Sequence, residues 1–357
     1  MKIKTLTYKR LINQHLKILK SLQKSSGLFI ASKNKKTGYD KAWLRDNFYE
    51  CLAFDIIGDW ATVKKTCRAL INIFLKHERK IDFAIEKKPE HTYEFIHARF
   101  NPETFDEYWE EWGNKQNDSI GAILFMIGEL EHSRKIKIIE NKNDLRIVNK
   151  LVKYLNTIEY WHDKDSGMWE EEEEVHTSSI GTCVAGLKNI KNIEGIEVPD
   201  ELIKRGEMAL NNILPRESKK KFVDLALLSL IWPYNVVTPK QRDDILKNVI
   251  YHLEKKMGVI RYKGDHYYNK NLDNYSEEAE WVFGISWLSI IFDKLGDIKK
   301  AKHYLKKAIK LVTPQGVVPE LYFSNSPNFN KNAPLGWAES LFIVALYEFN
   351  KKYGLGR

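Results

Sequence analysis

Cysteine is scarce in this sequence, and the few cysteines are poorly placed for cross-links or metal binding. The chain has three of them, Cys51, Cys67 and Cys183, and no CxxC pair. Disulfide frameworks and zinc knuckles need paired or closely spaced cysteines, so neither is predicted here. A reducing, cytoplasmic location is the expected one.

Clustered metal ligands and glycine-rich loops are missing as well. The histidines His162, His176 and His266 are isolated from other ligand-type residues, and we predict that they are surface or loop residues. No glycine-rich phosphate-binding loop occurs. The sequence therefore predicts no metal and no organic cofactor.

Long apolar runs are also absent. A membrane helix needs about 18 or more consecutive apolar residues, and no segment meets this requirement. The N-terminal segment MKIKTLTYKRLINQHLKILK is basic and amphipathic, without the unbroken apolar centre of a signal peptide. We expect neither a signal peptide nor a membrane partner.

Positive charge exceeds negative charge, but it is spread along the chain. Lysine and arginine total 57 against 48 aspartates and glutamates, which gives a formal net charge of +9 and a pI near 9.1. The lysines occur in every polar segment, as in KNKK at 33–36 and ESKKKF at 217–222, and not beside glycine and aromatic residues on one face. This distribution is typical of a solubilising surface, so no nucleic-acid partner is expected.

Apolar residues recur at spacings of three and four along nearly the whole chain, which predicts one helix after another. The expected helices span 5–24, 43–57, 60–77, 116–133, 143–160, 177–190, 198–213, 220–232, 238–254, 276–295, 297–312 and 335–351. Runs such as GAILFMIGEL are apolar all round, whereas DIKKAKHYLKKAIKLV carries a lysine-rich face. Alternating inner and outer helices predict an all-α double shell, an α/α toroid. Because no Pro/Gly/Ser-rich linker divides it, the chain 1–357 is expected to form one domain.

Tryptophan marks a candidate site. Several of the ten tryptophans stand beside charged residues where loops lead into helices: GYDKAWLRDNF (38–48), YWEEWGNKQND (108–118), SGMWEE (166–171) and EEAEWVF (277–283). Indole rings stack on the apolar CH faces of a sugar, while carboxylate and guanidinium groups bind its hydroxyls. These junctions together predict a carbohydrate site at one end of the toroid.

The same stretches carry a resemblance to glycoside hydrolase family 15, the glucoamylase family, and to the related helical domain of phosphorylase kinase regulatory subunits. The chain resembles the family in GYDKAWLRDNFYECLAF, in EEWGNKQNDSIGAIL, in SGMWEEEEEVHTSSIG and, further on, in VIRYKGDHYY and QGVVPELYF…APLGWAESLFIVAL. The motifs follow one order over most of the chain. The resemblance implies an (α/α)6 barrel that binds α-glucans or oligosaccharides.

Two glutamates acquire catalytic roles through this resemblance. It implies that Glu170 is the general acid and Glu320, in VPELYF, the general base, with Glu171 a ligand of the neighbouring sugar. Where the family commonly has glutamine after the base, this chain has Leu321. An inverting mechanism would place the two catalytic carboxyls about 6.5–9.5 Å apart.

The resemblance also implies a set of sugar-binding positions. Arg45 and Asp46 would hold hydroxyls of the terminal sugar, Tyr39 would lie near the attacking water, and Trp112 would brace the acid. The remaining implied contacts are Trp43, Trp169, Arg261 and Trp281.

The residue chemistry agrees with the role given to Glu170. Met168 and Trp169 are apolar neighbours, and further glutamates follow, so desolvation and like charge should both favour the protonated form. Glu172 to Glu174 are expected to be solvated and to complement the N-terminus of the helix at 177–190.

Three functions from different classes stay open. The leading one is an inverting exo-hydrolase that releases glucose from the non-reducing ends of α-glucans. The others are a non-catalytic glycan-sensing module of the phosphorylase kinase type, and hydrolysis of another α-linkage such as trehalose or an α-1,6 glucan. Neither a starch-binding domain nor a β-sandwich domain is evident in the sequence.

Overall fold

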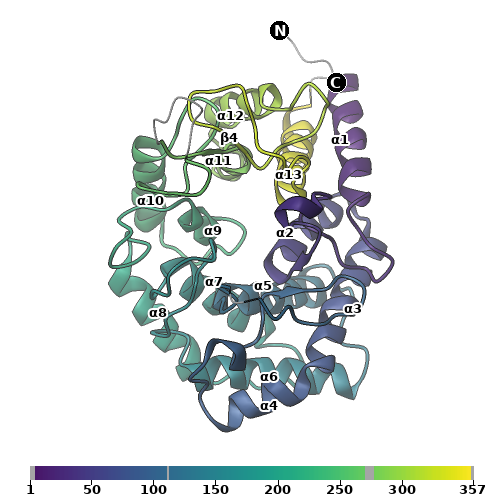
Figure 1. The fold of residues 1–357 in the computed structure, drawn as a ribbon, viewed down its shortest axis with the longest axis vertical. Coiled ribbons are helices and arrows are strands. Elements are labelled where there is room, and N and C mark those ends of the chain that lie inside the picture. The colour runs from purple at the N-terminus through teal and green to yellow at the C-terminus, as the bar shows by residue number, and fades with distance from the viewer. Residues whose placement is uncertain (1–4, 111, 270–276, 355–357) are drawn as a thin grey trace.

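Six helices form a closed inner ring in the computed structural model, which describes residues 5–110, 112–269 and 277–354. They are α2 (Leu44–Ile57), α5 (Asn117–Gly128), α7 (Thr177–Ile190), α9 (Leu228–Ile231), α11 (Phe283–Lys294) and α13 (Gly336–Tyr353). Each helix contacts the next one in this order, and α13 returns to α2 (Figure 1). The ring of six hairpins confirms the predicted (α/α)6 barrel.

A second layer of helices covers the ring. The outer helices are α1 (Thr5–Lys20), α3 (Trp60–Lys76), α6 (Lys142–Ile158), α8 (Asp200–Ile213), α10 (Pro239–His252) and α12 (Ile298–Lys310), and α4 (Glu78–Glu86) packs on α6. Helix α12 buries only Ala301, Tyr304, Leu305 and Ala308, whereas α11 is buried over nearly its whole circumference. The apolar stripe of an outer helix faces the ring, and its lysines face solvent.

Glycines allow α5 and α7 to pack in direct backbone contact. A Cβ atom on Gly121 would lie 2.6 Å from the backbone nitrogen of Cys183, and one on Gly186 would lie 2.4 Å from the carbonyl oxygen of Gly121. Such distances are well below van der Waals contact, so any side chain would push the two helices apart. This close pair places the start of α7, and the acidic segment before it, beside the start of α5.

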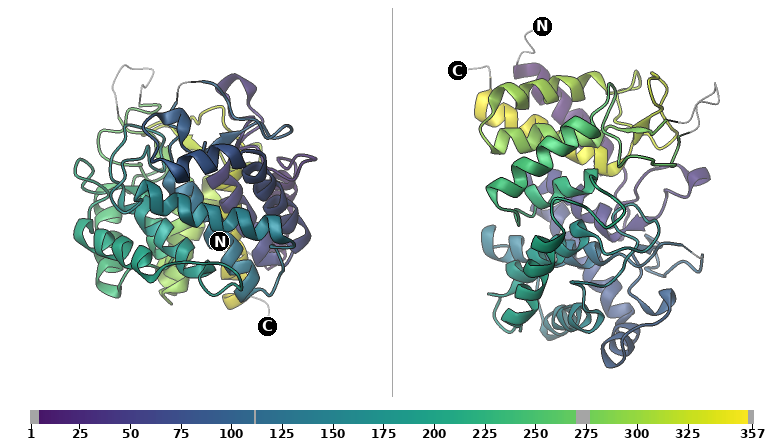
Figure 2. Two further views of the ribbon diagram at one scale, coloured as in Figure 1. Left: turned by 90° about the horizontal axis from the view of Figure 1, so that it is seen from below. Right: turned by 90° about the vertical axis from the view of Figure 1, so that its left-hand side faces the viewer.

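Long loops gather at one end of the barrel, as the side view in Figure 2 shows. Two short antiparallel ladders pin them: β1 (Ala42–Trp43) pairs with β2 (Arg99–Phe100), and β3 (Glu280–Trp281) pairs with β4 (Leu321–Tyr322). Short 3₁₀ turns lie at Lys35–Thr37, Thr92–Glu94 and Leu225–Leu227, and a π-helical turn at Glu129–Ser133. Among the described residues, no helix has the length and apolarity that crossing a membrane requires.

One observed helix was not predicted, and two expected helices differ from those observed. The sequence suggested none at 78–86, because α4 buries only Ile81 and Ala84 and so shows little periodicity. The helix expected at 220–232 is helical only over 225–231, because the side chain of Asp224 accepts from the amide of Ala226 and starts the helical turn there. The helix expected at 276–295 begins at Phe283, since 280–281 pair as a strand, and position 276 lies outside the described residues.

Candidate active site

One cavity of about 370 Å³ contains every site residue that the sequence pointed to. Its lining includes Tyr39, Trp43, Arg45, Asp46, Trp112, Trp169, Glu170, Glu171, Arg261, Trp281 and Glu320. Tyr267, Leu335 and Trp337 complete much of the rest. Segments separated by up to about 300 residues in the chain thus meet at the ends of α2, α5, α11 and α13.

Glu170 lies in a tight turn that we call the acid turn, residues 166–171. The amide of Glu171 donates to the carbonyl of Ser166 at 3.0 Å, and Asp165 pairs with Glu174 on either side of the turn. The backbone of Glu170 has φ +65°, in the left-handed region that non-glycine residues avoid. Holding a residue there costs on the order of 1–3 kcal/mol, a strain that structures keep mostly at functional positions.

The environment of Glu170 favours its neutral form. Burial raises the pKa of Glu170 to about 7, with Asp46 adding to the effect and Arg45 opposing it. The side chain is 22% exposed and accepts a long 3.3 Å contact from Arg45. A carboxyl group of this kind keeps its proton at neutral pH in a substantial fraction of molecules, which a general acid must do.

Glu320 is held very differently. Its side chain is almost fully buried, and Tyr39 donates to Oε1 at 2.8 Å. Asn332 donates to Oε2 at 2.8 Å, and Asn330 donates to the same oxygen. Burial raises the pKa of Glu320, while these three hydrogen bonds oppose the rise because they stabilise the carboxylate. The donors fix the carboxylate in one orientation within the cavity.

Arg45 projects from the first turn of α2, and both of its terminal nitrogens are engaged. It donates to Gln116 at 2.8 Å and to Asp118 at 3.0 Å, and its other terminal nitrogen faces Glu170. Burial raises the pKa of the neighbouring Asp46 to about 6, with Arg45 opposing. The guanidinium is therefore fixed by α5 while one edge stays directed toward the cavity.

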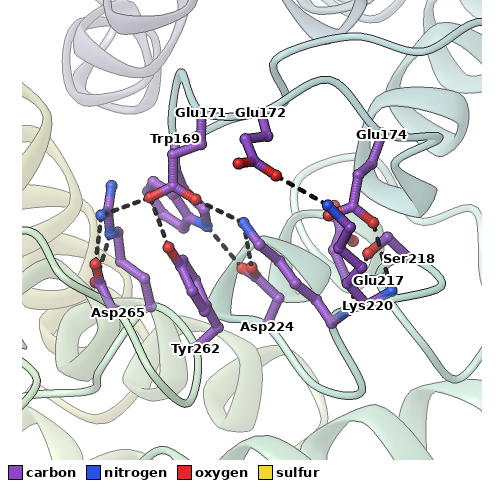
Figure 3. A network of polar contacts seen from close by, with 12 residues as sticks. Trp169, Glu171, Glu172, Glu174, Glu217, Ser218, Lys220, Asp224, Tyr262 and Asp265 are labelled. Atoms are coloured by element: carbon purple, nitrogen blue, oxygen red, sulfur yellow. Dashed lines mark hydrogen bonds and ion pairs between the residues drawn. The ribbon is translucent and has the colours of Figure 1, made fainter.

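Glu171 lines both this cavity and a second one. Its carboxylate accepts from Arg261 at 2.9 Å, from Tyr262 at 2.8 Å and from Lys221 at 2.8 Å (Figure 3). The cationic partners lower the pKa of Glu171 despite its burial, so it is ionised. Asp265 anchors Arg261 from the other side at 2.6 and 2.7 Å. The adjoining cavity, of about 600 Å³, shares Glu171 with the first.

Indole rings form two of the cavity walls. Trp169 lies 5.6 Å from Trp281 and 6.3 Å from Trp337, measured between ring centroids, and its Nε1 donates to Asp224 at 2.8 Å. On the other side Trp43 meets Trp112 at 6.1 Å. Flat apolar faces beside carboxylates suit a pyranose ring.

The contacts that support the site differ in how far the sequence signalled them. Gln116 and Asp118, which hold Arg45, lie within the quoted stretch WGNKQND, and Trp337 lies within APLGWAES, so their motifs marked them. Asn330 and Asn332 carried no such mark, since SNSPNFNKN has the composition of an ordinary loop. Only the fold brings that loop back onto Glu320.

One expectation about the histidines is wrong. His176 was expected on the surface or in a loop away from other ligand-type residues, but it is only 3% exposed and its Nδ1 lies 3.2 Å from Glu217. The pair forms because Glu217, from a distant segment, also binds the first turn of α7. His162 and His266 are exposed, as expected.

The fold and the cavity define an (α/α)6-barrel protein with two carboxyls in a tryptophan-lined site at one end. The model of the glycosyl hydrolases family 15 matches residues 7–345, and the chain belongs to that family.

Curated relatives and solved structures divide between two kinds of protein. The liver isoform of the phosphorylase b kinase regulatory subunit alpha from Mus musculus is 26% identical over 410 residues, which cover 95% of this chain and 32% of the relative. The probable counterpart from Caenorhabditis elegans is 25% identical over 390 residues, 88% of this chain and 31% of the relative. This chain thus spans about a third of the length of these relatives.

The solved structures share the fold. A wild-type glycosidase superimposes with a TM-score of 0.82 at 17% identity, covering 97% of this chain and 98% of the other. A bacterial glucoamylase complexed with acarbose gives 0.73 at 16% identity, covering 96% of this chain and 55% of the other. The glucoamylase from Saccharomycopsis fibuligera gives 0.70 at 14% identity, covering 98% and 96%.

Proposed function

We propose that this protein is an inverting exo-acting glucosidase that releases glucose from the non-reducing ends of α-glucans or maltooligosaccharides. The observation that carries the proposal is the pair Glu170 and Glu320 in one cavity, with a raised pKa of about 7 on the first and three hydrogen-bond donors on the second. Glycoside hydrolysis by inversion needs one protonated and one ionised carboxyl.

In this mechanism Glu320 takes a proton from water as the water oxygen attacks the anomeric carbon. Glu170 gives its proton to the glycosidic oxygen as the bond between that oxygen and the anomeric carbon breaks. Tyr39, bonded to Oε1 of Glu320, is placed to orient the water. The released sugar then has the inverted, β configuration, and the enzyme returns to its starting state after Glu320 loses its proton to solvent and Glu170 regains one.

Groups around the pair would bind the terminal sugar. Arg45 and Asp46 would hold its hydroxyls, since both line the cavity and Arg45 is fixed by Gln116 and Asp118. Glu171 and Arg261 would contact the next sugar, because Glu171 lines both cavities and Arg261 is hydrogen-bonded to it.

A second candidate function is a non-catalytic, glycan-sensing module. The similarity at 25–26% identity to phosphorylase kinase regulatory subunits favours it. Against it stand the two carboxyls in unlike environments, which a site that only binds sugar does not require. Hydrolysis of trehalose or an α-1,6 linkage could use the same pair.

The test is incubation of the protein with maltose, longer maltooligosaccharides, trehalose and isomaltooligosaccharides, with free glucose as the readout. We expect glucose from the maltooligosaccharides. Binding of maltooligosaccharides by calorimetry without glucose release would favour the sensing module. Glucose from trehalose or isomaltose alone would keep the catalytic pair and change the linkage.

A further inference from the structure

The acid turn is enclosed by close packing on two sides. A Cβ atom on Gly113 would lie 2.8 Å from the carbonyl oxygen of Glu170. A Cβ atom on Gly167 would lie 2.7–3.0 Å from three atoms of the His176 ring. The turn therefore rests directly on the imidazole, with no side chain between. A left-handed Glu170 persists only where its surroundings hold it in this way.

His176 is itself fixed from behind by Glu217. The two side chains are 3% and 2% exposed, and His176 Nδ1 lies 3.2 Å from Glu217 Oε1. Glu217 also accepts from the hydroxyl of Ser178 at 2.5 Å and from the Ser178 amide at 3.1 Å. The partners raise the pKa of His176 to about 9, so the ring is cationic at neutral pH. Its place and tilt are set by α7 and by the loop that carries Glu217.

That loop, residues 216–224, contacts the acidic segment at further points. Lys221 binds Glu171, Lys220 binds Glu172, and Asp224 accepts from the indole of Trp169 (Figure 3). The 216–224 loop thus faces the acid turn along its length. A further contact runs from Glu217 to His176, whose ring packs against Gly167, three residues before Glu170.

We propose that His176, oriented by Glu217, is a positioning residue that holds the acid turn so that the Glu170 carboxyl stays inside the cavity beside Arg45. The inference rests on the proposed role of Glu170 as general acid. When the imidazole support is removed, the strained turn relaxes and the carboxyl moves toward solvent.

This relaxation should change the pKa of Glu170 in a defined direction. Burial is the largest cause of the raised pKa of Glu170; Arg45 and Arg99 oppose the rise, and Asp46 adds to it. Tyr39 is close enough for Glu170 to raise its pKa in turn. A carboxyl that moves outward loses burial first, so its pKa falls toward the ordinary glutamate value. Less of it then carries a proton at neutral pH.

The experiment follows Glu170 in the full-length protein by ¹³C NMR of labelled glutamate carboxyls, assigned by comparison with Glu170→Gln. In His176→Gln we expect the pKa of Glu170 to fall by about half a unit or more. Glu217→Gln, which keeps the size of the side chain, should give a smaller fall in the same direction. Leu155→Ala, in the buried face of α6 away from the cavity, is the control that lowers stability and leaves this pKa unchanged.

Enzyme kinetics supply the second readout. His176→Gln should lower kcat on the order of 10-fold with KM within about twofold, because the imidazole supports the turn at Gly167, while Glu171 at its end keeps its own donors Arg261, Tyr262 and Lys221. The alkaline limb of the pH profile should shift to lower pH together with the NMR pKa. The Leu155→Ala control should change neither quantity.

The NMR titration needs no turnover, so it separates this inference from the proposed function. A wild type without hydrolysis would defeat the proposed function and still allow the pKa of Glu170 to report on the support by His176. An unchanged pKa of Glu170 and an unchanged kcat in folded His176→Gln would overturn the inference. Should that variant fail to fold, an unchanged pKa in Glu217→Gln would overturn it equally.

Discussion

The two carboxyls of the cavity are held by different means. Glu170 lies in a strained turn, is partly exposed and accepts one long hydrogen bond from Arg45. Glu320 directly precedes β4 and accepts hydrogen bonds from three neutral donors. Burial raises the pKa of both, but Glu320 accepts three hydrogen bonds that favour its ionised form, whereas the contact from Arg45 to Glu170 is a single long one. This difference is what the proposed roles, Glu170 as acid and Glu320 as base, require.

The largest effect is expected when either carboxyl is replaced by an amide. We expect Glu170→Gln to bind substrate but lose activity by a factor on the order of 10²–10⁴, because an amide cannot deliver a proton. Glu320→Gln should lose a similar factor. The double variant should lose far less than the product of the two, since both groups act on one transition state. Rates on maltotriose for the three variants check this.

Glu172→Gln is the matched control for these replacements. Glu172 lies two residues from Glu170, is 84% exposed on its side chain and pairs with Lys220. Its replacement should leave kcat within about twofold, as expected for a solvated ion pair. A loss comparable with that of Glu170→Gln would mean that the whole acidic run, and not one carboxyl, matters.

A smaller effect is expected at Arg45, which connects the acid to the bound sugar. A lysine at this position keeps the charge but cannot bridge Gln116, Asp118 and Glu170 at once. We expect kcat/KM to fall roughly 10- to 100-fold, the loss of one or two hydrogen bonds to a charged group. Arg134→Lys, which alters a similar forked pair with Asp55 on the exposed surface, should change nothing measurable.

The hydrogen bonds that Glu320 accepts from asparagine side chains can be tested one at a time. Asn332→Ala removes a hydrogen bond that lowers the pKa of Glu320, so that pKa should rise. Because the base must be ionised, the acidic limb of the kcat/KM profile should move to higher pH by about half to one unit. Asn328→Ala, in the same loop but exposed, should leave the limb in place. A limb that moves to lower pH would contradict the assigned role of the donors.

The smallest effect is expected at the border of the two cavities. Lys221→Met removes one of three donors to Glu171 and leaves Arg261 and Tyr262 in place. Partly exposed ion pairs contribute about 1 kcal/mol or less, so KM should rise less than about fivefold and kcat should hold. Initial rates over a maltotetraose concentration series measure both.

The sequence predicted much of this architecture and less of its fine structure. The closed ring followed from helical periodicity and from helices that are apolar all round, as in α5 and α11. The tryptophan-bearing motifs predicted that a site lies at one end of the barrel, and the family resemblance implied its lining, including Arg261 and Glu320 outside those motifs. Local pattern could not reveal contacts between distant loops, such as Asn332 on Glu320 or Glu217 on His176, because they depend on how the barrel closes. The same holds for the left-handed turn at Glu170, which no residue preference favours.

The central claim is that Glu170 and Glu320 act as acid and base on opposite sides of one glycosidic bond. Proton NMR of a fresh digest of maltooligosaccharide, recorded before mutarotation, tests it most directly, since inversion at an α-linkage must produce β-glucose first. We predict that the β-anomer signal rises ahead of the α-anomer signal. Initial appearance of α-glucose would contradict the account.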